Sequence, residues 1–138
     1  MANSVCDVFL VDGPIAAPGH DLPAETGGVV DFWGVVRKTE DGSEIAALEY
    51  EAHRLMAEHQ LQALAEEAAR RFGLTQVRIT HRLGAVPAGE ASLLVRIGSR
   101  HRAAAFQASV WVVDELKKRV PIWKHPVFTS RSAQSAAA

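Results

Sequence analysis

The fold class follows from residues 44–72, EIAALEYEAHRLMAEHQLQALAEEAARRF, within which the spacing of apolar side chains changes. In the first part, Leu48 and Tyr50 alternate with two glutamates, which is typical of a strand with one buried and one solvated face. The second part carries an apolar stripe at helical spacing, formed by Leu61, Leu64, Ala65, Ala68 and Phe72. Gly73 follows in the position of a helix C-cap. We therefore predict a strand over residues 44–51 and an amphipathic helix over residues 54–72.

Further elements are predicted on both sides of this stretch. They are strands at 5–11, 28–36, 76–86 and 91–98, a second helix at 101–119 and an extended segment at 122–128. The short link Pro87–Glu90 favours an antiparallel hairpin. This order predicts an α+β domain with a mostly antiparallel sheet and two main helices. We expect a single domain over residues 1–128 and a flexible, small and polar tail over 129–138.

The composition favours one soluble domain. The chain has 138 residues, of which 48% are apolar and 22% charged, and this suffices for one buried core. It has no uninterrupted apolar run of about 18 residues and no signal-peptide pattern at its N-terminus, so we expect a cytoplasmic protein. Cys6 is the only cysteine, which excludes intramolecular disulfides and cysteine-rich zinc sites.

Several common classes of site lack their motifs. His53 and His59 do not have the i,i+4 spacing of a helical zinc pair, and the HExxH, P-loop, GxGxxG and GxSxG patterns are all missing from the sequence. Nucleic-acid binding would need basic residues interleaved with exposed aromatic side chains, and two aromatic residues of the basic half fit core positions instead. The sequence therefore favours neither a metal site, a nucleotide cradle nor a nucleic-acid surface.

The charges are divided between the two halves of the chain. The net formal charge is only -1, yet residues 1–69 carry 13 acids and 3 bases, whereas residues 70–138 carry 3 acids and 12 lysines and arginines. One interpretation is an anionic ligand or an acidic partner for the basic half. The alternative is that the two halves neutralise each other across the folded domain.

The second predicted helix places a lysine among apolar residues. On a helical wheel, Phe106, Val110, Val113 and Leu116 fall in one sector, and Lys117 lies inside it. This lysine either extends its head to solvent at the helix end or lies in a pocket that makes it a usable nucleophile or base. Trp111 and Val112 fall outside the predicted core sector, so we expect them to form a subunit contact in a homodimer.

A second lysine, Lys124, follows seven residues later in Ile122–Pro126. The chain holds only four lysines, and Pro121 separates Lys124 from the helix. Two ammonium groups near one site suit one of them as a nucleophile and the other as an electrostatic stabiliser. The alternative is an ordinary edge strand that a lysine and a proline protect from pairing.

Two further basic positions are candidates for anion binding. Ser99–Arg102 stands at the start of the second helix, where two arginines and a histidine suit a phosphate, although a solvated basic turn has the same composition. Arg37 closes an apolar strand, and Gly34 within that strand predicts a bulge or the close approach of a ligand.

Taken in order, several motifs between residues 27 and 125 resemble those of the large, catalytic subunit of molybdopterin synthase. The motifs are Phe32–Arg37, Leu48–Glu51, His81–Gly84, Pro87–Glu90, His101–Phe106 and Leu116–Lys124. Single motifs are weak signals, but HR-x2-AF followed by LK-x-R-x-P-x-WK at this spacing is highly specific. The resemblance implies a hammerhead-like α+β fold and a dimer flanked by two copies of a small ubiquitin-like sulfur-carrier subunit.

The resemblance also implies an activity and a set of site residues. The C-terminal thiocarboxylate of the carrier would donate sulfur to cyclic pyranopterin monophosphate, and two rounds would form the molybdopterin dithiolene. Lys117 would be the catalytic lysine and Lys124 its partner, both also touching substrate. Arg37, His101 and Arg102 would bind the phosphate and the pterin. No metal or organic cofactor is implied.

Some positions depart from the family's pattern. Lys38 stands where relatives often carry asparagine, and His125–Pro126 replace the usual basic residue and glutamate. Neither change removes a residue assigned to the chemistry. The alternative function is a non-catalytic anion-binding or scaffolding module of the same fold, and a gap at either lysine would have favoured it.

Overall fold

A computed structural model describes residues 5–129 of the chain. In chain order its elements are β1 (Cys6–Val11), β2 (Gly28–Val35), β3 (Thr39–Glu40), β4 (Ser43–Ala52), α1 (Arg54–Phe72), β5 (Leu74–Arg82), β6 (Gly84–Pro87), β7 (Ala91–Ser99), α2 (Arg102–Arg119) and β8 (Ile122–Phe128). The predicted flexible tail lies outside the described residues except for Thr129.

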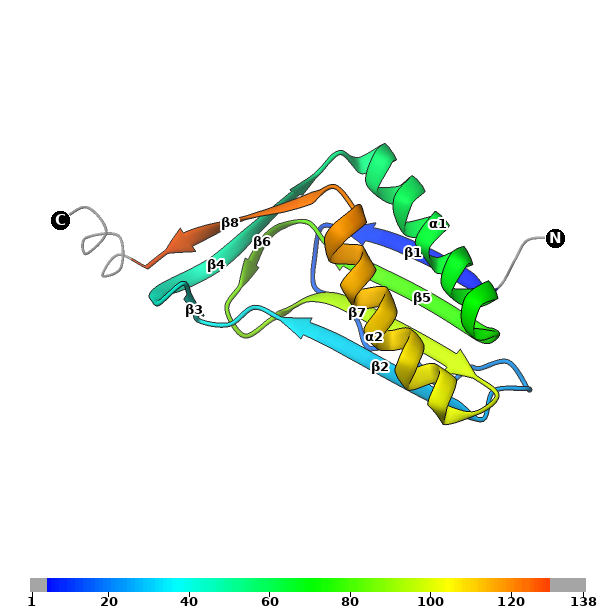
Figure 1. Ribbon diagram of the computed structural model, residues 1–138. Coiled ribbons are helices and arrows are strands. Elements are labelled where there is room, and N and C mark those ends of the chain that lie inside the picture. The colour runs from blue at the N-terminus through cyan, green and yellow to red at the C-terminus, as the bar shows by residue number, and fades with distance from the viewer. Residues whose placement is uncertain (1–4, 130–138) are drawn as a thin grey trace.

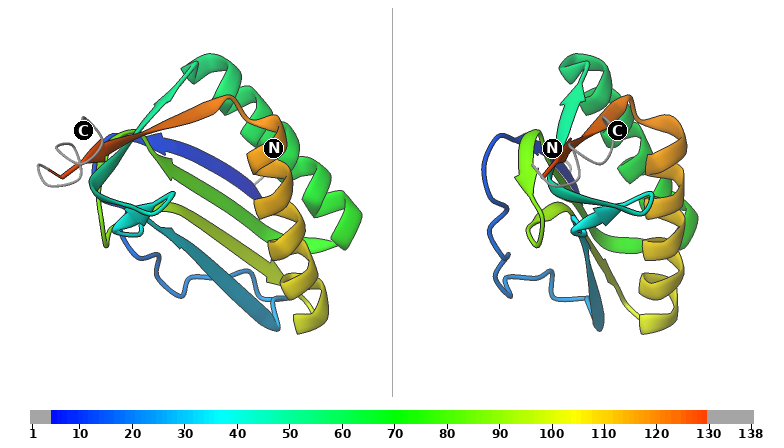
Figure 2. Two further views of the ribbon diagram at one scale, coloured as in Figure 1. Left: turned by 60° about the vertical axis from the view of Figure 1, so that its left-hand side comes forward. Right: turned by 90° about the vertical axis from the view of Figure 1, so that its left-hand side faces the viewer.

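The strands form two sheets, and both helices cover the first of them. The first sheet has the order β1-β5-β7-β2, in which only β1 and β5 run parallel. In the second, β4 pairs antiparallel with β3, β6 and β8. Both helices lie on one face of the first sheet, while the segment that leads from β1 to β2 runs over the other face (Figures 1 and 2). The predicted α+β class with a mostly antiparallel sheet is confirmed.

One predicted strand is divided into two. Residues 76–86 were expected to form a single strand, but β5 ends at Arg82 and β6 begins at Gly84, in the other sheet. Gly84 has φ 86°, a left-handed conformation that glycine adopts without strain and that turns the chain between the sheets. The antiparallel pairing predicted between residues 76–86 and 91–98 is found between β5 and β7.

The first helix has the predicted boundaries, because both of its ends are capped. The ring of His53 accepts a hydrogen bond from the backbone N–H of Met56 at 3.3 Å. Gly73 ends the helix with φ 63°. The side chains that α1 buries are Ala57, Leu61, Leu64, Ala65 and Ala68. The apolar stripe read from the sequence is therefore correct, apart from the partly buried Phe72.

The face that the second helix buries overlaps the predicted one only in part: Leu116 is buried and Val113 packs against the core as predicted. Phe106 and Val110 are 59% and 64% exposed, whereas the buried face consists of Ala105, Ala108, Ser109, Val112 and Leu116. Small side chains allow α2 to lie close to the sheet. At its first turn a Cβ added to Gly28 would stand 3.2 Å from the Cα of Arg102. The helical wheel wrongly placed Phe106 and Val110 in the core because it assigned the buried positions to the largest apolar side chains.

The predicted subunit contact through Trp111 and Val112 is also wrong. Val112 is fully buried, and the Trp111 ring packs edge-on against Phe72 of α1 with 5.8 Å between ring centroids. The guanidinium groups of Arg71 and Arg119 lie 5.1 and 5.7 Å from the centre of the same ring. The tryptophan therefore joins the two helices within one chain.

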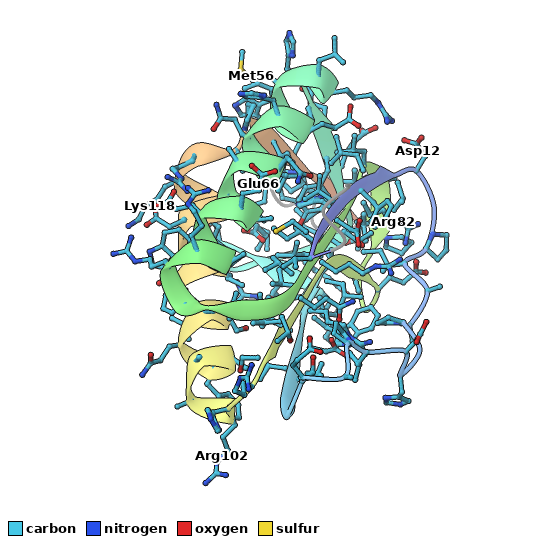
Figure 3. The ribbon with its side chains drawn as sticks, turned by 90° about the vertical axis from the view of Figure 1, so that its right-hand side faces the viewer. Asp12, Met56, Glu66, Arg82, Arg102 and Lys118 are labelled. Atoms are coloured by element: carbon cyan, nitrogen blue, oxygen red, sulfur yellow. The ribbon has the colours of Figure 1, made fainter. Side chains whose placement is uncertain are left out.

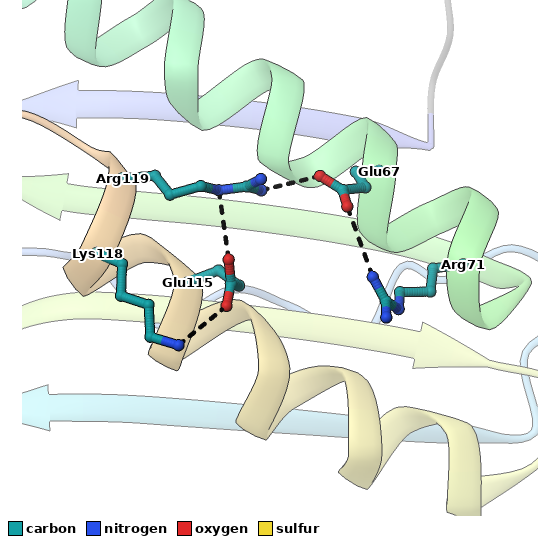
Figure 4. A network of polar contacts seen from close by, with 5 residues as sticks. All are labelled: Glu67, Arg71, Glu115, Lys118 and Arg119. Carbon is teal, nitrogen blue, oxygen red and sulfur yellow. Dashed lines mark hydrogen bonds and ion pairs between the residues drawn. The ribbon is translucent and has the colours of Figure 1, made fainter.

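An ion-pair network covers this helix contact (Figure 4). Glu67 of α1 accepts a hydrogen bond from Arg119 of α2 at 3.0 Å and lies 3.7 Å from Arg71. Glu115 pairs with Arg119 at 3.6 Å and with Lys118 at 3.4 Å. All five side chains are partly or largely exposed, so the network adds little to the stability that the buried helix contact supplies.

Two apolar clusters hold the molecule together. The larger one fills the space between the first sheet and the helices. The smaller one, formed by Val36, Ile45, Leu48 and Val86, joins the second sheet to the segment after β2. Among residues 5–129 no helix is long and apolar enough to span a membrane.

Candidate functional site

A cavity of about 560 Å³ opens between the end of α2, the second sheet and the edge strand β2. This volume suits one small organic molecule. The residues that line it are Phe32, Trp33, Gly34, Val35, Val36, Arg37, Glu40, Leu48, Tyr50, His81, Ser92, Leu93, Leu116, Lys117, Val120, Ile122 and Lys124. Three of the five predicted site residues are among them.

The two lysines reach the cavity from either side of a reversal of the chain. Leu116 and Val120 are buried and anchor the last turn of α2, whose end is marked by the hydrogen bond from the Val120 N–H to the Leu116 carbonyl. Pro121 then directs the chain into β8, which carries Lys124. Both lysines are exposed, and each lines the cavity.

A bulge brings Arg37 to the same cavity. The register of β2 against β7 shifts between Gly34 and Val35, which confirms the predicted irregularity at Gly34. Val36 is buried in the smaller cluster, and its backbone is hydrogen-bonded to both Glu90 and Gly89. Because Val36 is fixed, Arg37 directly after it has a defined position at the cavity wall.

Tyr50, His81 and Glu40 are among the lining residues that were not assigned to the site from the sequence. Tyr50 lies opposite Lys124 in the β4–β8 ladder, and its ring meets the ring of His81 edge-on with 5.0 Å between centroids. Glu40 lies 3.5 Å from the Lys124 ammonium. The alternation in β4 did predict that Tyr50 faces inward, and the other two lay in motifs or turns with no pattern of their own.

His81 is a neutral polar group in a cavity whose charged lining residues are mostly cations. It is 5% exposed, and its Nδ1 lies 2.8 Å from the carbonyl oxygen of Arg82, so Nδ1 carries the hydrogen that it donates. Burial lowers the pKa of His81 below its ordinary 6.5, against the smaller opposing effect of this hydrogen bond. The neutral ring therefore keeps a free acceptor at Nε2.

The structure does not bring His101 and Arg102 to this cavity. His101 is the N-cap residue of α2 and Arg102 its first residue, both exposed. Fifteen helical residues between Arg102 and Lys117 correspond to about 22 Å. Figure 3 shows Arg102 at the far end of α2 from Lys118, with its side chain directed outward. Within one chain the predicted phosphate ligands are divided between two distant places.

Cys6 has none of the properties of a sulfur-carrying nucleophile. Its side chain is 5% exposed in the larger apolar cluster. Burial, with smaller contributions from Glu66 and Asp7, raises its pKa to about 11. The thiol is thus protonated at neutral pH and inaccessible. Among residues 5–129 no three His, Cys, Asp or Glu side chains are grouped to hold a metal ion.

The two charged halves of the chain neutralise each other only in part. Asp31 pairs with Arg96, Glu67 with Arg119 and Glu40 with Lys124, and each pair joins the acidic half to the basic half. The cavity nevertheless has Arg37, Lys117 and Lys124 against the single carboxylate of Glu40. The neutralisation of the two halves is therefore incomplete, and the cavity keeps a surplus of positive charge.

Comparison with known proteins gives consistent matches. Residues 14–119 match the model of a family described as MoaE protein. A protein of Pyrococcus abyssi named molybdopterin synthase catalytic subunit is 42% identical over 104 residues, which are 75% of this chain and 70% of that protein. The crystal structure of molybdopterin synthase from Staphylococcus aureus superposes with a TM-score of 0.82 at 30% identity, covering 88% of this chain and 90% of that one. The molybdopterin cofactor biosynthesis protein E of Burkholderia multivorans gives a TM-score of 0.77 at 28% identity, covering 96% of both chains.

Proposed function

The chain belongs to the MoaE protein family, and on that premise we propose that its cavity transfers sulfur from the C-terminal thiocarboxylate of a small carrier subunit to cyclic pyranopterin monophosphate. It is accordingly an enzyme of molybdenum cofactor biosynthesis, a sulfurtransferase of the molybdopterin synthase class. The observation that carries the proposal is the convergence of Arg37, Lys117 and Lys124 on one cavity of small-molecule size.

Three cations in one cavity suit a reaction between two anions. The thiocarboxylate and the substrate phosphate are both negative, and they repel each other in solution. Arg37 offers a planar fork that matches a phosphate, whereas the lysines offer compact charges. Ammonium groups that face the reacting atoms stabilise negative charge as it develops in the transition state. Lys117 is our candidate for the central group, acting as nucleophile, base or electrostatic stabiliser.

The rest of the lining suits a flat ring system. Phe32 and Trp33 of β2 are 38% and 36% exposed and form an aromatic part of the wall. Such faces pack well against a pterin ring. The free acceptor of the neutral His81 ring complements the N–H donors of a pterin. We propose that these residues hold the ring while the basic residues hold the phosphate.

Each carrier delivers one sulfur atom. When the sulfur leaves, the carbon–sulfur bond of the thiocarboxylate breaks and a water oxygen takes the place of sulfur on the carbonyl carbon, so the carrier is left with an ordinary carboxylate. A dithiolene contains two sulfur atoms, so two carriers must be consumed for each product. The extended carrier tail would enter the open side of the cavity toward Lys117.

We further propose that His101 and Arg102 act in the cavity of a second copy of the chain. About 22 Å of helix separates them from Lys117 in one copy, so a shared site needs two copies. A homodimer also gives a partner to the apolar side chains that the fold leaves exposed. Phe106 and Val110 on α2, at 59% and 64% exposure, are in the same helical row as Lys117.

The direct test mixes the purified chain with a thiocarboxylated carrier and cyclic pyranopterin monophosphate and assays the dithiolene product. We expect product only with the thiocarboxylated carrier, and none with a carrier that ends in an ordinary carboxylate. Failure to form product while both reactants bind would reduce the chain to the alternative binding module.

A complementation experiment tests the sharing of sites. Lys117→Ala and Arg102→Ala should each be inactive, with Arg102→Ala weakening pterin binding far more than carrier binding. Co-expression of the two should restore about a quarter of wild-type activity, since half of the dimers are mixed and each mixed dimer has one intact site. No recovery, together with a monomer in light scattering, would show that Arg102 does not act in trans.

A further inference from the structure

The cavity contains a carboxylate that the reaction does not require. Glu40 is the only acidic residue among those that line it, and its side chain is 19% exposed. One of its oxygen atoms, Oε1, lies 3.5 Å from the Nζ of Lys124. Glu40 is therefore already paired with Lys124, one of the three cationic side chains that an anionic substrate would contact.

The position of Glu40 is set by a tight hairpin. Glu40 pairs with Ser43 across the turn Asp41–Gly42, whose φ values of 51° and 83° are both left-handed. Asp-Gly in this conformation is the preferred two-residue turn between antiparallel strands. On either side, Val36 and Ile45 are each 2% exposed in the smaller apolar cluster. The hairpin thus rises from a packed base and holds the carboxylate at the cavity.

The contact between Glu40 and Lys124 is weak enough for a ligand to replace Glu40. Strong charge-assisted hydrogen bonds measure about 2.7–2.9 Å, and this contact is longer, at 3.5 Å. Lys124 keeps 55% of its side chain exposed, so water and salt screen the attraction. A phosphate in the cavity can contact Arg37 and Lys117 as well as Lys124, whereas Glu40 pairs with Lys124 alone, and this favours the exchange of Glu40 for a phosphate oxygen at Lys124.

We propose that Glu40 is an internal competitor that holds Lys124 in the empty site and that the substrate's phosphate displaces. The proposal rests on the proposed function and deepens it by naming a residue that sets the affinity for the substrate. The carboxylate also disfavours small anions that contact Lys124 alone, because only a ligand that also contacts Arg37 or Lys117 gains by replacing it. Glu40 is thus a specificity-determining residue of this site.

The test compares the dissociation constants of wild type, Glu40→Gln and Glu44→Gln by titration calorimetry. Glutamine keeps the size of the side chain and removes its charge, so Glu40→Gln should bind cyclic pyranopterin monophosphate about two- to fivefold more tightly. Glu44→Gln removes the same charge from an exposed position on the same hairpin and should bind as wild type. Equal or weaker binding by Glu40→Gln would overturn the proposal.

Two additions make the result specific. In a Lys124→Gln background the effect of Glu40→Gln should vanish, whereas an undiminished effect would show that Glu40 does not act through Lys124. At about 0.5 M salt the difference between wild type and Glu40→Gln should shrink, and a salt-independent difference would contradict electrostatic competition.

Inorganic pyrophosphate serves as a second probe that separates this proposal from the proposed function. Tighter pyrophosphate binding by Glu40→Gln, with no binding of the pterin to any variant, would support the competitor and defeat the assigned substrate. Pterin binding that is equal in wild type and Glu40→Gln would support the assigned substrate and defeat the competitor. Failure of both anions to bind any variant would defeat both.

Discussion

The two carboxylate–cation pairs at Asp31–Arg96 and Glu40–Lys124 differ in the burial of the cation and in the length of their contacts. Asp31 of β2 meets Arg96 of β7 through two hydrogen bonds of 2.7 and 2.8 Å, and Arg96 is only 4% exposed. The hydrogen bond to Asp31 raises the pKa of Arg96 against the opposing effect of burial. Glu40 and Lys124 have one contact of 3.5 Å on a largely exposed lysine. The same kind of ion pair therefore has a structural role in the first sheet and an accessible position at the cavity.

The difference shows how this domain separates stability from reactivity. In the first sheet Arg96 is buried, and it also donates to the carbonyl of Gly19 in the segment that precedes β2. At the cavity the charged side chains are left accessible, so that they interact with whatever enters. We expect variants of the first region to change folding and variants of the second to change catalysis.

The largest effect is expected at Lys117. Lys117→Ala should reduce product formation by on the order of 1,000-fold or more, because it removes the group proposed to act on the reacting atoms. Its melting temperature should match wild type, since Lys117 is exposed. Lys118→Ala is the matched control, because that side chain is 70% exposed and pairs with Glu115 outside the cavity. A steady-state assay that gives wild-type turnover for Lys117→Ala would remove this residue from the mechanism.

Lys124→Ala should be impaired by about 100- to 1,000-fold in turnover, as expected for the loss of one electrostatic stabiliser. The neighbouring His125 is exposed and pairs with Glu51 at 2.9 Å, so His125→Ala provides a control on the same strand. Single-turnover kinetics would locate the defect in the chemical step. A defect confined to KM would instead limit Lys124 to substrate binding.

In the first sheet, Asp31→Ala should destabilise the fold by about 3 kcal/mol, because it leaves the Arg96 guanidinium buried and without its carboxylate. Urea denaturation measures this loss. The double variant Asp31→Leu, Arg96→Met should recover most of it, since apolar side chains need no ionic partner. A loss below about 0.5 kcal/mol would show that the Asp31–Arg96 pair contributes as little to stability as an exposed ion pair.

The pH dependence of stability tests His81. Because burial lowers its pKa in the folded state, the unfolded chain takes up a proton near pH 6.5 while the folded chain does not. The contribution of His81 is therefore complete above pH 6.5 and is lost as the pH falls below it. His81→Gln should show a shallower decline in unfolding free energy between pH 7 and 5, whereas His59→Gln, on the exposed side of α1, should follow wild type.

The smallest effect is expected in the surface network. Glu67→Gln should cost at most about 1 kcal/mol, because its contacts with Arg119 and Arg71 are partly solvated. The same thermal or urea measurement suffices, repeated at high salt, where the cost should fall further. A larger cost would indicate that Glu67 also positions Arg119 over the Trp111 ring.

The sequence predicted most where the signal is local. The ends of α1 follow from caps and from one apolar stripe, and Ile122–Phe128 is the last strand as expected. For α2 the apolar pattern wrongly assigned Phe106 and Val110 to the buried face, because they are larger than the alanines that the helix buries instead. Lysine spacing likewise led to the cavity, whereas Glu40 has no pattern that distinguishes it from any other turn residue.

By itself the sequence determined the α+β class, the main helices and strands, the family, and the two lysines Lys117 and Lys124 before and after the end of the second helix. These rest on periodicity, capping and motif spacing, all of which act over a few residues along the chain. Only the tertiary structure decided which face of α2 is buried, that β5 and β6 enter different sheets, and that Glu40, Tyr50 and His81 join the lysines. Each of these depends on how closely distant segments approach one another, and that distance is set by packing across the whole domain.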